Sequence, residues 1–267
     1  MQLFKLSLDI IYEIFSYLGK SDLSNLRACS KLLSRWKLLL SLIYEKHQLF
    51  LLDDRHINML LGISSQDVNR LYVKGLQLDL PGLHIRRHEP VLGPELDSFA
   101  NLTKRLPNLE SIVFIGADPT FQRQHRFLRG VFETGSFLRS LKIQFLDWTF
   151  FETMHASDIS ALKINSLETL DLSVGNSMPN TIDDQETWEH RIRLSMNRGL
   201  KPVLATLALL EDLCLNFAHM RGLQICLSSV LPLGKTWQML KRIAFVEIDC
   251  EGHLVPLLDM THSSPSS

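Results

Sequence analysis

The chain has few of the features that support export, disulfide bonding or nucleic-acid binding. Its 267 residues include only four cysteines, and no two of them have C-x-x-C spacing. Scattered cysteines within apolar segments are typical of reduced thiols in cytoplasmic or nuclear proteins. The 28 Lys and Arg residues nearly balance the 29 Asp and Glu residues, and the net charge is −1. We therefore expect no disulfides and no nucleic-acid partner.

Targeting and membrane-spanning segments are also missing from the printed sequence. The N-terminus has no basic region or cleavage site of a signal peptide, and Asp9 and Glu13 interrupt its apolar residues. The longest uncharged stretch runs only from Gly222 to Gly234, which is too short to cross a bilayer. These observations predict a cytoplasmic and/or nuclear protein that makes no membrane contact.

Sequence motifs of common enzymes are absent. The chain contains no G-x-x-x-x-G-K-[ST], G-x-G-x-x-G, H-E-x-x-H or G-x-S-x-G, and its ten histidines are scattered. We therefore predict a protein that is not an enzyme and that needs no cofactor or metal. The alternative is an unrecognised hydrolase or transferase, which would require a cleft with convergent ionisable groups of shifted pKa.

The N-terminal segment predicts short helices that are apolar on more than one side. One stripe at steps of three and four contains Leu8, Ile11, Ile14, Phe15 and Leu18. Gly19 suits the end of this helix, and Ser21 suits the start of the next. A third helical pattern runs from 32 to 43. Ile10, Tyr12 and Tyr17 fall outside the first stripe, so we expect the first helix to need a second apolar partner.

These residues resemble an F-box. The matching positions are Leu6, Leu8, Asp9, Ile10, Ile14, Phe15, Leu18, Asp22, Leu23, Leu26, Arg27 and Cys29. The family usually has proline where this chain has Ser7, and often tryptophan where it has Leu32. The resemblance implies an F-box over residues 3–46 that docks on the Skp adaptor of cullin-RING ubiquitin ligases. The alternative is a three-helix bundle that buries only its own core.

The resemblance also implies which side chains bind the adaptor. They are Leu6, Leu8, Ile10, Ile14, Phe15, Leu18, Leu23 and Leu26. We expect the double substitution Ile14→Ala with Phe15→Ala to abolish adaptor binding while the rest of the chain stays folded.

An L-x-x-L-x-L pattern recurs through the remaining sequence. Its copies are Leu109/Ile112/Phe114, Leu138/Leu141/Ile143, Leu167/Leu170/Leu172, Leu210/Leu213/Leu215 and Leu240/Ile243/Phe245, with an earlier copy at Val68/Leu71/Val73. Most copies start about 30 residues apart, and two gaps are about 12 residues longer. Alternating apolar residues predict half-buried strands, and helical stripes lie between them, as at 127–132 and 223–231. An insertion at 184–197 reads as an exposed helix held by Trp188 and Met196.

The pattern resembles divergent leucine-rich repeats, like those that follow the F-box in fungal-type F-box proteins. The Asn or Cys of the family's motif is absent from every copy. We therefore predict an α/β protein, with a three-helix F-box followed at 47–260 by an irregular leucine-rich-repeat solenoid with a parallel concave sheet, and a disordered tail at 261–267. A generic α/β domain with a parallel sheet is the alternative.

Residues between the buried ones should face the concave side and contact a target protein. Those predicted for this role are Arg70, Tyr72, Lys74, Val113, Ile115, Lys142, Gln144, Asp171, Asp212, Asn216 and Arg242. The resemblance thus implies a substrate-recognition adaptor of an SCF-type ubiquitin ligase, which binds the Skp adaptor and an unknown target. A scaffold or binding module that engages the Skp adaptor or other proteins without serving a ligase is the alternative.

Overall fold

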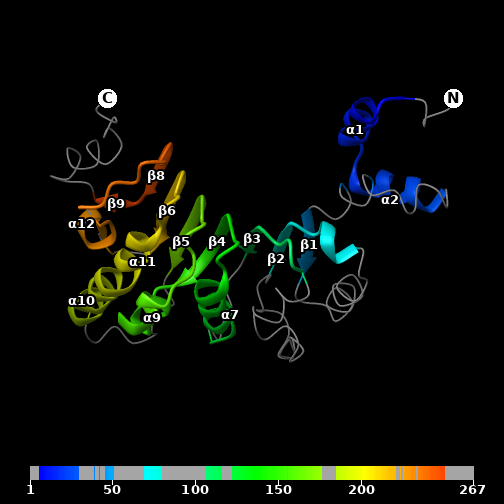
Figure 1. Cartoon of the computed structure of the whole chain (residues 1–267). Helices are drawn as coiled ribbons and strands as arrows, with labels where there is room; N and C mark the ends of the chain where they lie inside the picture. The colour runs from blue at the N-terminus through cyan, green and yellow to red at the C-terminus, as the bar shows by residue number, and fades with distance from the viewer. Residues whose placement is uncertain are drawn as a thin grey trace, which may run out of the picture.

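The computed structural model describes residues 6–29, 39, 42, 46–50, 69–79, 106–115, 122–154, 156–175, 185–220, 223, 225–232 and 234–249. A small helical unit comes first in the chain, and a parallel sheet covered by helices on one side follows it (Figure 1). The predicted α/β class with a parallel sheet is confirmed. Among the helices in these ranges, none combines the length and the apolar character needed to cross a bilayer.

The helical unit contains α1 (Leu8–Ser16) and α2 (Lys20–Cys29). Ser7 is extended, and its carbonyl accepts the first helical hydrogen bond of α1, from the Ile11 amide at 3.1 Å. The second helix begins earlier than predicted, because the Gly19 carbonyl accepts a bond from the Leu23 amide at 3.0 Å. Of the predicted third helix, only Leu39 and Leu42 lie within the described residues, and both are helical.

The helical unit has a small hydrophobic core of its own. Ile11 and Phe15 of α1 pack with Leu23 of α2 and with Leu39, and each of these four side chains is at most 4% exposed. Ile11 and Phe15 are one helical turn apart, so a single side of α1 faces this core.

The main sheet has seven strands, and every neighbouring pair is parallel. In order across the sheet they are β1 (Lys46–Phe50), β2 (Gly75–Asp79), β3 (Ser111–Ile115), β4 (Ser140–Asp147), β5 (Thr169–Gly175), β6 (Asp212–His219) and β8 (Arg242–Val246). The five segments that we predicted as strands from 109 onward are confirmed as β3, β4, β5, β6 and β8. Their second apolar positions lie side by side, and Ile112 pairs with Leu141, which pairs with Leu170.

A repeated hydrogen-bond pattern sets the register of these strands. The residue just before each of the strands β2 to β6 offers its carbonyl oxygen to two successive amides at the start of the next strand, at distances of 2.7 to 3.1 Å. The acceptors are Lys74, Glu110, Arg139, Glu168 and Glu211. Four of the pre-strand turns are also closed by the first leucine of the pattern, as where the Leu138 amide donates to the Gly135 carbonyl at 2.9 Å. Consecutive copies are therefore stacked in the same geometry.

The prediction for the first copy of the pattern was wrong. Residues Asn69–Tyr72 form a 3-10 helix (η2), in which Leu71 is exposed. The strand lies at β2, where Leu76 pairs with Ile112. Val73 can be the last apolar residue of the predicted copy or the first of a copy that starts later. The hydrogen bonds that the carbonyl of its neighbour Lys74 accepts from the next strand show that the later copy is the one formed. The leading strand β1 was not predicted, since the register places His47 where the other strands carry Leu or Ile.

Helices cover one side of the sheet, below it in Figure 1. They are α7 (Gln122–Thr134), α8 (Thr149–Glu152), α9 (Ala156–Ser160), α10 (Gln185–Ser195), a π-helical turn η3 (Met196–Leu200), α11 (Lys201–Thr206) and α12 (Leu227–Val230). The predicted helix over 223–231 is partly wrong. Its start forms strand β7 (Ile225–Cys226), which pairs with β9 (Ile248–Asp249) in a second, two-stranded sheet, and α12 follows directly.

The insertion between β5 and β6 is helical, as predicted, but it is more firmly held than an exposed helix. Ile192 and Met196 are fully buried, and Trp188 packs on the same core. At Gly199 the π-helical turn closely approaches α8, because an added Cβ would lie 2.6 Å from the Phe151 carbonyl oxygen. The insertion thus belongs to the hydrophobic layer behind the sheet.

Candidate functional site

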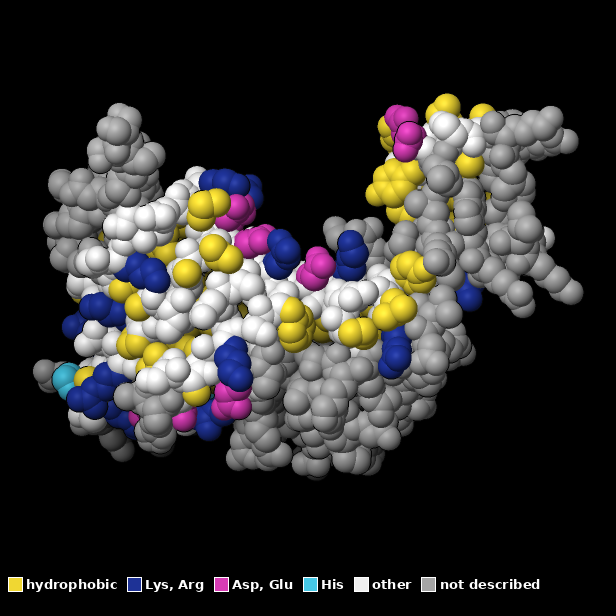
Figure 2. Space-filling model, viewed as in Figure 1, with side chains coloured by type: hydrophobic (Ala, Val, Ile, Leu, Met, Phe, Trp, Pro, Cys, Tyr) yellow, Lys and Arg dark blue, Asp and Glu magenta, His cyan; other side chains and the backbone are white. Residues whose placement is uncertain are grey.

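An exposed apolar stripe runs along α1 next to the side that faces the helical core. Ile10, Ile14 and Tyr17 are 48%, 38% and 82% exposed, and their spacing of four and three residues places them on one side of the helix. We call these three residues the α1 patch. Tyr12 is also exposed, but its position in the helix places it beyond the buried side, away from the α1 patch. Hydrophobic side chains are visible at this end of the helical unit in Figure 2.

The structure separates the predicted adaptor-binding residues into groups. Ile10 and Ile14 belong to the α1 patch, whereas Leu6, Leu18 and Leu26 are half-buried against the helical core. The side chain of Leu8 lies outside the described residues.

Two of these predicted residues need correction. Phe15 is 2% exposed and Leu23 is 4% exposed, so both belong to the helical core and cannot reach a partner in this arrangement. Sequence reasoning placed Ile14 and Phe15 on one stripe, because they are neighbours, but the boundary between the buried and exposed sides of α1 runs between them.

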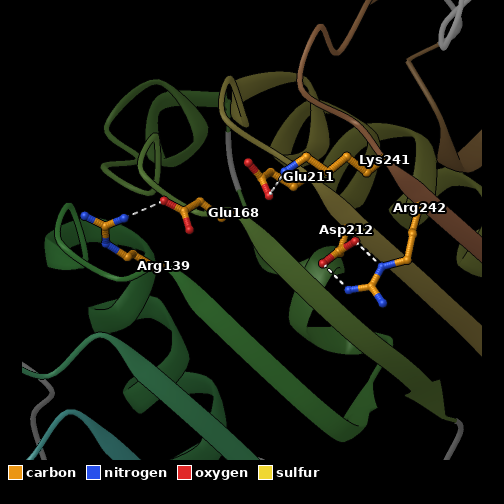
Figure 3. A network of polar contacts seen from close by, with 6 residues as sticks. All are labelled: Arg139, Glu168, Glu211, Asp212, Lys241 and Arg242. Carbon is orange, nitrogen blue, oxygen red and sulfur yellow. Dashed lines mark hydrogen bonds and ion pairs between the residues drawn. The ribbon is translucent and has the colours of Figure 1, made fainter. Parts of the chain in front are cut away.

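The second surface is the face of the sheet opposite the helices. Positively and negatively charged side chains lie together in a row along the upper side of the sheet in Figure 2. At the amino ends of the strands, Arg139 pairs with Glu168 at 2.7 Å and Lys241 pairs with Glu211 at 2.7 Å (Figure 3). These pairs join residues from consecutive copies of the repeated unit. They follow from the stacking, since it places equivalent positions side by side.

Two further ion pairs lie within the strands. Arg242 of β8 holds Asp212 of β6 through two hydrogen bonds, Nε to Oδ1 at 2.6 Å and Nη2 to Oδ2 at 2.7 Å (Figure 3). This bond to the guanidinium holds the pKa of Asp212 below its ordinary value. Lys142 of β4 pairs with Asp171 of β5. Next to that pair, burial first and then the Asp171 carboxylate raise the pKa of the Cys214 thiol, so this cysteine stays protonated and unreactive at neutral pH.

The ion pairs change the interpretation of the predicted target-binding residues. Lys142, Asp171, Asp212 and Arg242 do lie on this face, but each is already neutralised by a neighbour. They leave no isolated charge to select a charged target. Such cross-strand pairs instead contribute to the pairing of the strands.

The other predicted target-binding residues fall into two groups. Val113 and Ile115 of β3 are half-buried on alternate positions, as expected for the outward side, and Gln144 is exposed. Asn216 is half-buried, and its Oδ1 accepts a bond from the Ala218 amide at 2.8 Å. Three other residues were wrongly predicted to lie on a strand, because the strand starts later than expected. Arg70 and Tyr72 lie in η2, and Lys74 precedes β2.

Sequence reasoning missed an aromatic group at the carboxyl ends of the central strands. Phe145 of β4 and His219 of β6 have ring centroids 5.6 Å apart, on either side of Gly175 of β5. A Cβ on Gly175 would collide with the Phe145 ring, so the ring lies directly against this glycine. The available signal was the break in alternation after Ile143, where Phe145 and Leu146 follow each other.

The described residues contain no group of three or more His, Cys, Asp or Glu side chains arranged to hold a metal ion. Neither protein-family models nor curated proteins gave any match to this chain. The two surfaces, the α1 patch and the outward face of the sheet, are therefore the candidate sites on which a function can be argued.

Proposed function

We propose that this protein is the substrate-recognition subunit of an SCF-type ubiquitin ligase, with an F-box at its N-terminus and irregular leucine-rich repeats after it. The α1 patch carries this proposal. A helix that buries Ile11 and Phe15 in its own core and still exposes Ile10, Ile14 and Tyr17 has an apolar side without a use inside the unit. Apolar helix sides of this kind are suited to a hydrophobic groove on another protein.

In this proposal each of the two surfaces binds a different partner. The α1 patch binds the Skp adaptor and so connects the chain to the cullin-RING ligase. The outward face of the sheet holds the target protein. The protein makes and breaks no bond itself; it raises the effective concentration of target lysines near the ubiquitin carrier.

Co-expression with a Skp adaptor followed by size-exclusion chromatography tests the proposal. The wild-type chain should elute with the adaptor as one complex. Ile14→Asp should abolish co-elution, because a carboxylate at a buried interface position costs several kcal/mol. The matched control is Asn25→Asp, which adds the same charge at an exposed position of α2.

Both variants should keep the wild-type circular dichroism spectrum, because both substituted side chains are exposed. Separate elution of the folded wild-type chain and adaptor would contradict the proposal. Adaptor binding alone would also suit a scaffold outside a ligase. Ubiquitination of a bound partner, lost with Ile14→Asp, separates the ligase subunit from that scaffold.

A further inference from the structure

Irregular strand pairing singles out one part of the outward face. Between Ile143 and Leu146, β4 carries two residues where β5 carries only Ser173, and the register shifts there. Between Asn216 and His219, β6 likewise carries one residue more than β5 does between Ser173 and Gly175. Bulges of this kind re-aim side chains and are enriched next to functional sites. Here two of them flank a single strand.

The bulges bring an aromatic side chain onto the outward face. Leu170, Leu172 and Val174 of β5 are buried, so by alternation the Cβ direction at Gly175 points outward. Since that Cβ would meet the Phe145 ring, the ring must lie on the outward side of the sheet. The His219 ring lies 5.6 Å from it between centroids, in a tilted arrangement, and His219 is itself exposed.

The surroundings of this ring differ from the rest of the face in charge. The ion pairs of β4, β5, β6 and β8 all lie toward the amino ends of the strands. The pair that lies farthest along the strands is Lys142 with Asp171, at the third residue of β4 and of β5. Toward the carboxyl ends, the outward residues Gln144 and Asn216 carry amides. The carboxylate of Asp147 is fully buried and accepts bonds from the Thr149 amide, at 2.9 Å, and from its hydroxyl.

One buried polar atom points to the same place. Ser173, between the two bulges, is 6% exposed, and its hydroxyl has no hydrogen-bond partner among the described residues. An unpaired buried hydroxyl costs free energy, and such groups are uncommon in native proteins. It therefore marks the region between the bulges as one where stability has not been optimised, as at binding sites.

We infer that the target protein is held mainly by Phe145 and His219, and that it presents an uncharged, extended segment with an aromatic or large apolar side chain. We call Gln144, Phe145, Gly175, Asn216 and His219 the carboxyl-end patch. An aromatic ring supplies a large contact area at low entropic cost, and the two amides can pair with the backbone of a peptide. None of the five residues of the carboxyl-end patch carries a fixed charge, which disfavours acidic or basic segments because they would lose hydration without a counter-charge. This inference rests on the proposed role of the sheet as the target-binding surface.

Selection from a phage-displayed library of random peptides tests the inference on the full-length chain. Before selection, the library is depleted on the Phe145→Ala variant, which removes peptides that bind elsewhere. Enriched peptides should be uncharged and should contain aromatic or large apolar residues. Their affinity for Phe145→Ala should be at least about tenfold lower than for the wild type, as for a central contact residue.

A second variant keeps the aromatic side chain and moves it. Gly175→Ala inserts a methyl group where the ring lies, so the ring must shift while Phe145 is retained. We expect the same loss of peptide affinity, with thermal unfolding close to that of the wild type. The matched control is Arg139→Gln with Glu168→Gln, which removes an ion pair from the other end of the same face and should leave affinity unchanged.

Three outcomes would overturn the inference: no enriched peptide, enrichment of charged peptides, or wild-type affinity in both Phe145→Ala and Gly175→Ala. The selection does not involve the Skp adaptor. A chain that binds such peptides through Phe145 but never elutes with the adaptor would refute the ligase proposal and leave this inference standing.

Discussion

Two glycines test how closely η3 packs against α8 within the helical layer. A methyl group at Gly199 would lie 2.6 Å from the backbone oxygen of Phe151, which cannot turn aside as a side chain can. At Gly234 nothing lies within 4 Å of an added Cβ. We predict that Gly199→Ala lowers the free energy of unfolding by about 1–3 kcal/mol, and that Gly234→Ala changes it by less than about 0.5 kcal/mol.

Urea unfolding of both variants followed by circular dichroism measures this difference. Equal stability of Gly199→Ala and the wild type would show that η3 does not approach α8 as closely as described.

The ion pair between Asp212 and Arg242 should make a small, pH-dependent contribution to stability. The folded-state pKa of Asp212 is lowered, so the unfolded chain binds more protons at this site and stability rises with pH. The contribution is present above the unfolded pKa of about 3.9 and is lost as pH falls through the folded-state value. Because both side chains are partly exposed, solvent screens the interaction and its magnitude is small.

We therefore predict that Asp212→Asn lowers the melting temperature slightly at pH 7, and that the difference from the wild type shrinks as the pH falls below about 3.9. Differential scanning calorimetry across this range measures it. Glu133→Gln, at an exposed position of α7, is the control for simple loss of a carboxylate. A difference that persists at low pH would exclude the ion pair as its cause.

At the scale of single elements, the strands from β3 onward could be predicted because each combines alternation with a preceding leucine. The positions of β1 and β2 depend on contacts with neighbouring strands and could not be predicted from the local sequence. Val73 fits two frames of the same pattern, and only the hydrogen bonds that the Lys74 carbonyl accepts from the Glu110 and Ser111 amides distinguish them. Strand β1 pairs through its backbone without the apolar pattern, so its sequence carries no period-two signal.

The carboxyl-end patch illustrates a different limit. Strict alternation describes regular strands, and the bulges in β4 and β6 break it at the positions that turn Phe145 outward. The same rule that located Val113 and Ile115 on the outward face therefore failed a few residues along the next strand.

Strand register can be tested with one pair of lysine substitutions in β3. Ile112 is fully buried, and its neighbour Val113 is half-buried on the outward face. We predict that Ile112→Lys unfolds the repeat region, because it buries an unpaired charge, and that Val113→Lys remains folded. Thermal unfolding by circular dichroism distinguishes the two. The reverse result would mean that the register is wrong by one residue.

At the scale of the whole molecule, the described residues form two separate hydrophobic cores. One joins Ile11, Phe15, Leu23 and Leu39, and the other extends across the sheet and its helices. The sequence predicted two parts with a boundary at 46, but it could not divide the residues of α1 between core and surface. Composition indicates only that α1 is apolar on several sides, and the position of α2 determines which side is buried.

Two independent cores predict that the two proposed binding activities can be removed one at a time. Ile14→Asp should abolish co-elution with the Skp adaptor and leave peptide affinity unchanged, and Phe145→Ala should have the opposite effect. In the double variant both losses should occur, each with the size found in the single variant, because substitutions at sites without shared partners act additively. Chromatography and peptide titration on the same four proteins measure this. Loss of peptide affinity in Ile14→Asp would show instead that the helical unit and the sheet are energetically coupled, so that the adaptor could influence how the target is held.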